Sequence, residues 1–447
     1  MLETIISVGS VCSGIEAASV ALDDKSYNIK WFAELAEEPS RILKERYPSI
    51  PNYGDMCILP SLINNREIKA PDIICGGTPC QAFSLAGWKK GLNDDRGNLT
   101  LKFVDIINEN DAIRKEHDKP KTVMLWENVE NVLKDKTNAF GCFLASLLGY
   151  NHEIKSKKWP SSGVIHGNGR NVAWRVVDAK YFGLPHQRKR LYVLSGGKDF
   201  YPENVLFDGF PKPFVDYGEQ PLFFDKQGHK IEVFRSYTDC LYSAYGTKWN
   251  GNAAAYNGSL FIVQNERLRR LTPLECERLM GFPDNYTVIP KIKRTNQYMA
   301  IGNSWAVPVI RWLGSRLSNE LQNKSNSILT KEACASNELD GLDNNDMYFN
   351  IATKENLSLG RNNINGSPIP EFPILGNISD IIDINPDEKL YISPVGCKGI
   401  LRRKEERGLN INSRLEYHLT NISSQMPAED IEKASRVQKR GRFSTYA

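Results

Sequence analysis

Several features that mark other protein classes are missing from this chain of 447 residues. No stretch holds about 18 uninterrupted apolar residues, and residues 1–7 do not open a basic region followed by an apolar one, so neither a membrane span nor a secretory signal is expected. The nine cysteines include no CxxC pair and the six histidines no HExxH spacing, which argues against a disulfide framework and a metal site. We therefore expect a cytoplasmic protein that needs no metal and does not associate with membranes.

A strong excess of one charge is also absent. The formal net charge is +4, which neither requires nor excludes nucleic acid as a partner. Hydrophobic residues make up 41% of the chain and charged residues 25%, as in globular proteins, and the length suffices for two or three domains.

Short apolar runs alternate with amphipathic stretches as far as about residue 317. Strands are predicted at residues 5–8, 29–32, 72–75, 123–126 and 191–194, and helices at 39–47 and 99–108. This alternation predicts an α/β fold with a mainly parallel sheet covered on both faces. Ligands in such folds bind at the carboxyl ends of the strands.

Changes in amino-acid composition divide the chain further. Residues 196–265 are rich in aromatic and turn-forming residues, which predicts a domain inserted between two parts of the main domain, 1–195 and 266–322. Residues 323–373 are rich in Asn, Ser, Asp and Glu, which predicts a poorly ordered linker. Residues 374–447 form an accessory segment with basic, helical character.

The strongest local signal is the sequence GGTPCQAFS at residues 76–84, directly after a predicted strand. A cysteine on a loop that leaves a strand, beside a proline that restricts the backbone, is presented where a thiolate can attack a ligand. The alternative is that Cys80 is a buried structural cysteine, the commoner role for a single cysteine.

Four more blocks follow in order: WENV at 126–129, GLPHQRKR at 183–190, RLTPLECERLMGFP at 270–283 and IGNS at 301–304. Singly, Glu127 could cap a helix, the two arginines could lie on a solvated strand edge, and residues 302–304 could form an ordinary turn. Together and in this order, the blocks resemble the signature motifs of the cytosine-5 DNA methyltransferase family, of the phage or bacterial type. The resemblance covers about residues 5–317.

The resemblance implies a catalytic role for four residues. Cys80 would add to carbon 6 of cytosine, Glu127 would contact ring nitrogen 3 and the exocyclic amine, and Arg190 would contact oxygen 2, with Arg188 beside it. Attack at carbon 6 makes carbon 5 nucleophilic, and the acid and the cation stabilise the charge that develops. The reaction requires the cytosine to be flipped out of the duplex.

The cofactor implied by the resemblance is S-adenosylmethionine. The small-residue turn after the first strand suits close approach by a ligand, although Cys12 stands where the family usually has Phe and Glu16 where it has a second Gly. Glu34 matches the acid that binds the ribose, and Asp55 the acid near the adenine amine. The full set of expected cofactor residues is Cys12, Ser13, Gly14, Ile15, Glu16, Glu34, Asp55, Pro79, Asn303 and Ser304. A further departure, His186 in place of the usual Gln, should be tolerated.

Double-stranded DNA is the expected partner. Residues 196–265 match the position of the family's target recognition region, and candidate DNA contacts are Gln81, Ser84, Lys248, Arg402 and Arg403. In the accessory segment, Ser393, Pro394 and Gly408 predict the start and end of one helix. Its basic face is equally consistent with DNA contact and with simple exposure to solvent.

The sequence thus predicts a Rossmann-like, S-adenosylmethionine-dependent methyltransferase sheet with an inserted recognition region and a C-terminal extension, acting as a monomer in a bacterial or phage-infected cell. Two alternatives stay open. One is the branch of the family that methylates tRNA. The other is a DNA-binding protein that kept the fold and lost the activity, against which Cys80, Glu127 and Arg190 argue by their joint presence. Neither the target site nor a role in restriction-modification, anti-restriction or regulation follows from the sequence.

Overall fold

The computed structural model describes residues 5–22, 25–79, 99–216, 218, 220–246, 256–323, 325–330, 334, 338–352 and 364–434. Cys80, Gln81, Ser84 and Lys248 lie outside the described residues. Among the helices that the structure describes, none has the length and apolar character needed to cross a membrane.

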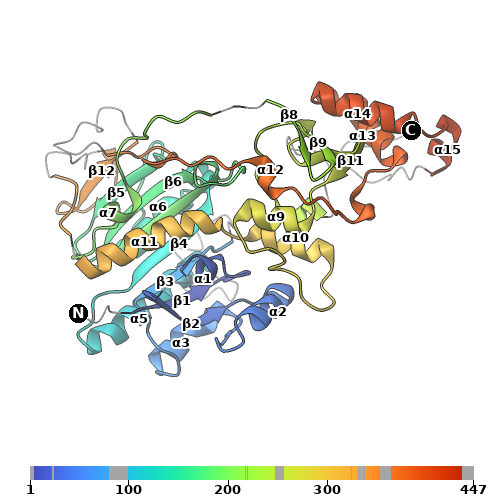
Figure 1. The fold of residues 1–447 in the computed structure, drawn as a ribbon. Coiled ribbons are helices and arrows are strands. Elements are labelled where there is room, and N and C mark those ends of the chain that lie inside the picture. Colours follow the sequence, from blue (N-terminus) through green and yellow to red (C-terminus); the bar gives the residue numbers. More distant parts are fainter. Residues whose placement is uncertain are drawn as a thin grey trace.

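An eight-stranded sheet forms the centre of the larger part of the molecule, in the order β12-β5-β6-β7-β4-β3-β1-β2 (Figure 1). The pairs β1–β2, β1–β3 and β3–β4 are parallel, as the sequence predicts, whereas β7, β6, β5 and β12 extend the sheet with antiparallel pairs. The strands are β1 (Ile6–Val11), β2 (Tyr27–Ala33), β3 (Ile73–Gly76), β4 (Val123–Val129), β5 (Ser162–His166), β6 (Asn171–Asp178), β7 (Lys189–Gly196) and β12 (Met347–Asn350).

Helices cover both faces of this sheet because its strands are apolar on both sides. One face packs against α3 (Leu59–Asn64), α5 (Leu99–Glu116) and α6 (Ala139–Leu148). The other packs against α1 (Ala17–Ala21), α7 (Pro202–Leu206) and α11 (Val307–Asn323). Helix α2 (Glu37–Arg46) follows β2, and α9 (Pro273–Met280) and α10 (Arg294–Asn303) lie between the sheet and the second domain (Figure 1). The predicted helices 39–47 and 99–108 correspond to α2 and α5.

Strand register brings the sequence motifs to one edge of the sheet. Val11 pairs with Gly76, and Gly76 pairs with Trp126. The residues that come next in the chain, including Glu127, therefore share that edge. Strand β7 runs back from the same edge, since Arg190 pairs with Val129.

The second domain is built from two distant parts of the chain. A four-stranded antiparallel sheet has the order β11-β10-β9-β8, with β8 (Leu222–Lys226), β9 (His229–Val233), β10 (Phe261–Gln264) and β11 (Arg267–Arg270). Helices α13 (Pro394–Arg407) and α14 (Ser413–Ser423) pack on it, followed by α15 (Ala428–Ala434). Their shared apolar core joins Phe234, Phe261, Val263 and Leu268 to Cys397, Ile400, Leu415 and Leu419.

This arrangement corrects the predicted boundaries. The C-terminal segment is not an accessory, because it supplies seven of the twelve buried residues in the core of the second domain. Residues 202–206 of the predicted insert form α7 against the main sheet. The predicted helix is confirmed as α13, with Ser393 accepting a hydrogen bond from the amide of Gly396 and Gly408 closing the helix in a left-handed conformation.

The predicted linker, 323–373, is also wrong where the structure describes it. Strand β12 forms the edge of the main sheet by pairing with β5. Further along, the buried guanidinium of Arg175 donates hydrogen bonds to the carbonyl oxygens of Ser367 at 2.8 Å and Ile369 at 2.9 Å. From there the chain crosses to the second domain through α12 (Ile378–Ile381) (Figure 1).

Candidate active site

The chain segment that leads to Cys80 is held firmly against strand β4. Thr78 is buried, and its hydroxyl oxygen Oγ1 accepts a hydrogen bond from Trp126 Nε1 at 2.8 Å. The backbone carbonyl oxygen of Thr78 accepts another from Asn128 Nδ2 at 3.1 Å. Thr100 of α5 adds a third contact, at 2.6 Å between the two hydroxyl oxygens. The backbone two residues before Cys80 is therefore fixed beside Glu127.

Glu127 is the acid at this edge of the sheet. Its side chain is buried, and Oε1 lies 3.0 Å from Arg190 Nε. Trp305 donates a hydrogen bond to it, and Gly77 lies so close that an added Cβ would come within 2.9 Å of Trp305 Nε1. Burial raises the pKa of Glu127, although Arg190 and Arg188 act in the opposite direction. The carboxyl group consequently holds its proton to a higher pH than an exposed glutamate.

The two arginines of the predicted block both contact Cys240 but have different surroundings. Arg188 is buried and donates hydrogen bonds to the carbonyl oxygens of Ser304 at 2.6 Å and of Leu241 and Gly302 at 3.3 Å. Arg190 is more exposed and pairs with Glu127. Arg188 thus ties Leu241, which lies between β9 and β10, to the end of α10, and Arg190 is the guanidinium that faces the acid.

Cys240 was not singled out from the sequence, yet its sulfur lies between the two arginines. Its Sγ is 3.3 Å from Arg188 Nη1 and 3.6 Å from Arg190 Nη2. Burial acts to raise the pKa of the Cys240 thiol, but the two neighbouring guanidinium groups outweigh burial and lower it. No local motif marks this cysteine, because its partners lie about 50 residues away in the chain.

His186 replaces the usual glutamine without loss of hydrogen bonding. Burial and the charge of Arg188 lower the pKa of its imidazole to about 3, so the ring is neutral. Its Nε2 accepts a hydrogen bond from the amide of Leu241 at 3.0 Å, and Nδ1 lies 3.2 Å from the carbonyl oxygen of Leu279. A glutamine amide offers the same combination of one acceptor and one donor.

A cavity beside this cluster opens onto the turn after β1. Six of the ten expected cofactor residues line it, together with Glu127 and Trp305. Gly14 has a φ of +56°, and an added Cβ there would meet nothing within 4 Å, so open space lies above the turn. The lining residues are Ser10, Val11, Cys12, Ser13, Gly14, Glu16, Ala17, Ala18, Gly76, Gly77, Glu127, Asn303, Ser304 and Trp305.

The other four expected cofactor residues are not among this lining. Ile15 is buried in the core, and Asp55 and Pro79 are exposed. Glu34 lies beside the turn, where Oε2 accepts a hydrogen bond from the amide of Gly14 at 2.7 Å. A carboxylate offers about four acceptor positions, so this contact and a second one to Ala36 leave Glu34 with capacity for ligand hydroxyl groups.

Glu16 has a structural role even though it lines the cavity. Its carboxylate accepts hydrogen bonds from the side chains of Ser10 and Ser19 and from the amide of Ser19, so that Glu16 caps the N-terminus of helix α1. The Cys12 side chain turns toward Met56, with 3.5 Å between the sulfur atoms. Neither side chain offers the aromatic surface that the family usually provides at position 12 for stacking.

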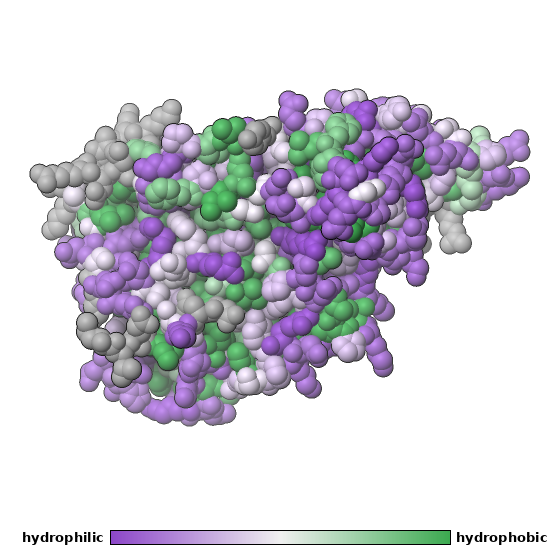
Figure 2. Space-filling model, in the orientation of Figure 1, coloured by the Kyte–Doolittle hydropathy of each residue, from purple (hydrophilic) through white to green (hydrophobic). Residues whose placement is uncertain are grey.

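Of the candidate DNA contacts, Arg402 and Arg403 fall within the described residues, on helix α13. The space-filling view shows a largely hydrophilic surface in this part of the molecule (Figure 2).

A mixed α/β sheet with a glycine turn and a ligand cavity at the carboxyl ends of its parallel strands defines a Rossmann-like methyltransferase. The comparisons specify which kind. The model of the family described as C-5 cytosine-specific DNA methylase matches residues 6–258 and 224–319, which together make up more than half of the chain. The protein therefore belongs to this family, whose members use S-adenosylmethionine to methylate carbon 5 of cytosine in DNA.

Several individual proteins are similar to this chain. The type II methyltransferase M.HhaI of Haemophilus parahaemolyticus is 27% identical over 59% of this chain and 80% of its own. A protein of Escherichia phage P1, named DNA N-6-adenine-methyltransferase, is 31% identical over 72% of this chain; the match spans only 62% of that protein. The solved structure of the S. pombe Dnmt2 methyltransferase aligns with 71% of this chain and 99% of its own, with 16% identity and a TM-score of 0.46.

Proposed function

We propose that this protein methylates carbon 5 of a flipped-out cytosine in duplex DNA through a covalent adduct with Cys80. The observation that carries the proposal is the pairing of Glu127 with Arg190 beside the anchored stem of the Cys80 segment. An acid and a guanidinium held 3.0 Å apart can contact nitrogen 3 and oxygen 2 of one cytosine ring.

In the proposed reaction, the Cys80 thiolate adds to carbon 6 of the ring. The displaced electron pair moves toward nitrogen 3, where the protonated Glu127 donates a hydrogen bond, and Arg190 stabilises the charge at oxygen 2. Carbon 5 then takes the methyl group. Loss of the carbon 5 proton and elimination of Cys80 restore the aromatic ring and the thiolate.

The cavity next to Glu127 is the proposed cofactor site. Bound S-adenosylmethionine would supply an electrophilic methyl group there. The backbone of residues 12–14 and the carboxylate of Glu34 would hold the nucleoside part, and Asn303 and Ser304 would close the cavity on the other side. Arg188 is proposed to act as a positioning residue, because its guanidinium is occupied by backbone carbonyl groups and by Cys240.

The test is incorporation of a labelled methyl group into duplex DNA by the full chain and by C80A. We expect C80A to fold and bind cofactor but to lose more than about 99% of the rate, since nucleophile removal typically costs several orders of magnitude. Wild-type protein should also form a denaturation-resistant adduct with target DNA that contains 5-fluorocytosine, only when S-adenosylmethionine is present. Retention of activity by C80A, or no adduct with an active preparation, would contradict covalent catalysis.

Nucleoside analysis of the product separates this proposal from the alternatives. Methylated tRNA would indicate the tRNA branch, and N6-methyladenine would indicate the activity in the name of the phage P1 relative. Bisulfite sequencing of host DNA would identify the target site. We also propose that the protein acts as a monomer in the cytoplasm; its place in restriction-modification or anti-restriction depends on that target.

A further inference from the structure

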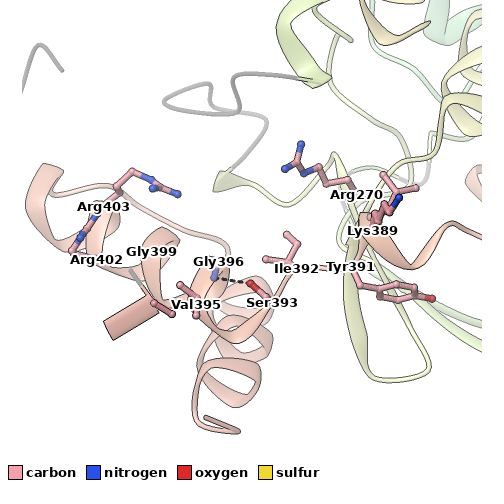
Figure 3. Close-up of a pocket in the computed structure, with 12 residues that line it drawn as sticks. Arg270, Lys389, Tyr391, Ile392, Ser393, Val395, Gly396, Gly399, Arg402 and Arg403 are labelled. Atoms are coloured by element: carbon pink, nitrogen blue, oxygen red, sulfur yellow. Dashed lines mark hydrogen bonds between the residues drawn. The ribbon is translucent and has the colours of Figure 1, made fainter. Parts of the chain in front are cut away.

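A cavity of about 480 Å³ lies in the second domain, between the end of β11 and helix α13. Figure 3 shows that Arg270 and Arg403 extend toward each other across it from these two elements. The segment before α13 forms the floor. The lining residues are Arg270, Lys389, Leu390, Tyr391, Ile392, Ser393, Val395, Gly396, Gly399, Arg402, Arg403 and Ala434.

The walls of this cavity are joined into one rigid unit. The amide of Ile392 donates a hydrogen bond to the carbonyl oxygen of Leu268 at 2.9 Å, which extends the sheet beyond β11. On the opposite side of the domain, Glu232 of β9 pairs with Arg414 at 2.9 Å and with His418 at 2.7 Å. These contacts hold the C-terminal segment against the four-stranded sheet of the second domain.

Positive charge is concentrated in the cavity. Four of its lining side chains are cationic and none of the lining residues is acidic. Arg402 pairs with Glu406 of the same helix, with 3.3 Å between Nε and Oε1. Burial and the neighbouring Arg402 and Arg407 hold the pKa of Arg403 below its ordinary value. A phosphate anion in the cavity would be attracted by these four cationic side chains.

The cavity is also connected to the proposed base site. Arg270 is close enough to Tyr242 to oppose the effect of burial, which raises the pKa of that phenol. Tyr242 and Ser243 lie against Gly302, where an added Cβ would come within 2.8 Å of their backbone. The carbonyl oxygen of Gly302 in turn accepts a hydrogen bond from Arg188. Arg188 lies beside Arg190 of the proposed base site, since both guanidinium groups contact the sulfur of Cys240.

We propose that this cavity binds backbone phosphates of the target duplex next to the methylated cytosine, and that the C-terminal segment supplies three of its four cations. The inference rests on the proposed function. The lining contains no Asn, Gln, Asp or Glu, the side chains that read adenine and cytosine, and guanine reading by its arginines is distinguished from phosphate contact by comparing target and non-target duplexes. Lysine and arginine clusters are the usual partners of phosphate.

The experiment compares K389Q, R403Q and the double variant with a matched control, K398Q. Lys398 is an exposed cation on the same helix that does not line the cavity. Binding of the full-length proteins to target and non-target duplexes would be followed by fluorescence anisotropy between about 50 and 200 mM salt. Thermal unfolding would show whether each variant is folded. If R403Q does not fold, K389Q still tests the inference, because Lys389 is exposed.

Each lost phosphate contact should reduce the slope of log affinity against log salt by about one, and affinity at 0.1 M salt by roughly fivefold to tenfold, equally for both duplexes. K398Q should match the wild type. Slopes identical to K398Q would overturn the inference, and a loss confined to the target duplex would assign the cavity to base reading instead. If the wild type binds and methylates DNA while the slopes stay unchanged, only this inference fails; if the wild type does neither, the proposed function itself fails.

Discussion

Replacing Glu127 with glutamine removes an ionisable proton from the proposed base site while leaving a side chain of nearly the same size. If the protonated carboxyl group assists attack at the cytosine ring, the single-turnover rate of methyl transfer should fall by about 10²- to 10⁴-fold, the usual contribution of a general acid. This corresponds to about 3–5 kcal/mol of transition-state stabilisation.

The structural cost of the same substitution should be smaller. Breaking a fully buried ion pair costs about 3–5 kcal/mol. Arg190, however, keeps contacts with the carbonyl oxygen of Lys189 and with Cys240, and its side chain is 15% exposed. We therefore expect the E127Q variant to lose about 1–2 kcal/mol of unfolding free energy, much less than it loses in catalysis.

The pH dependence gives a second, independent signature. Because burial raises the pKa of Glu127 in the folded state, the rate should decline as pH rises through that pKa, and this decline should be absent in E127Q. The difference in unfolding free energy between wild type and E127Q should change with pH in the same direction. The stability that the protonated form contributes is present below the pKa of an unfolded glutamate and lost as pH rises through the folded pKa, so E127Q should gain relative to the wild type as pH rises.

The assay is single-turnover methyl transfer at saturating DNA across this pH range, with urea unfolding measured in parallel. A matched control is E320Q: the pKa of Glu320 is also raised by burial, but this residue lies on α11 and contacts Asn204 instead of the active site. If E127Q keeps more than about a tenth of the wild-type rate, or if E320Q loses as much, Glu127 does not supply the proton.

Three further substitutions test the parts that the sequence did not predict. C240A should lower the methyl-transfer rate about tenfold by loosening Arg188 and Arg190, whereas C240S, which retains an acceptor, should recover most of it; equal rates for both variants would exclude a positioning role for Cys240. L415A should cost about 2–5 kcal/mol, measured by urea unfolding, because the buried Leu415 joins α14 to the four-stranded sheet of the second domain; a loss below about 1 kcal/mol would show that the helices are only loosely attached. F349A should lower the free energy of unfolding by about 3–5 kcal/mol, because the buried Phe349 packs β12 against the main sheet; an unchanged free energy would support the linker interpretation.

Local sequence patterns predicted the edge of the sheet on which Glu127 lies. Apolar runs followed by small or charged residues predicted strands whose ends share one edge, and the register of β1, β3 and β4 confirms that the acid of β4 lies there. The caps at Ser393 and Gly408 likewise predicted helix α13 from a few neighbouring residues. Such signals depend on interactions within a strand or a helical turn, so the residues that create them are close in the chain.

Only the tertiary structure decided which distant segments meet. The sulfur of Cys240 lies between Arg188 and Arg190. Strand β12 forms the edge of the same sheet that contains β1. Helices α13 and α14 pack on strands β8–β11, although more than 120 residues separate the end of β11 from the start of α13. The Asn- and Asp-rich sequence around the short apolar run of β12 resembles a linker, because a single edge strand needs few apolar residues once a neighbouring strand is in place. What the sequence determined was the chemistry and the local conformation of each motif; which motifs share a site followed from packing between segments far apart in the chain, which no local pattern records.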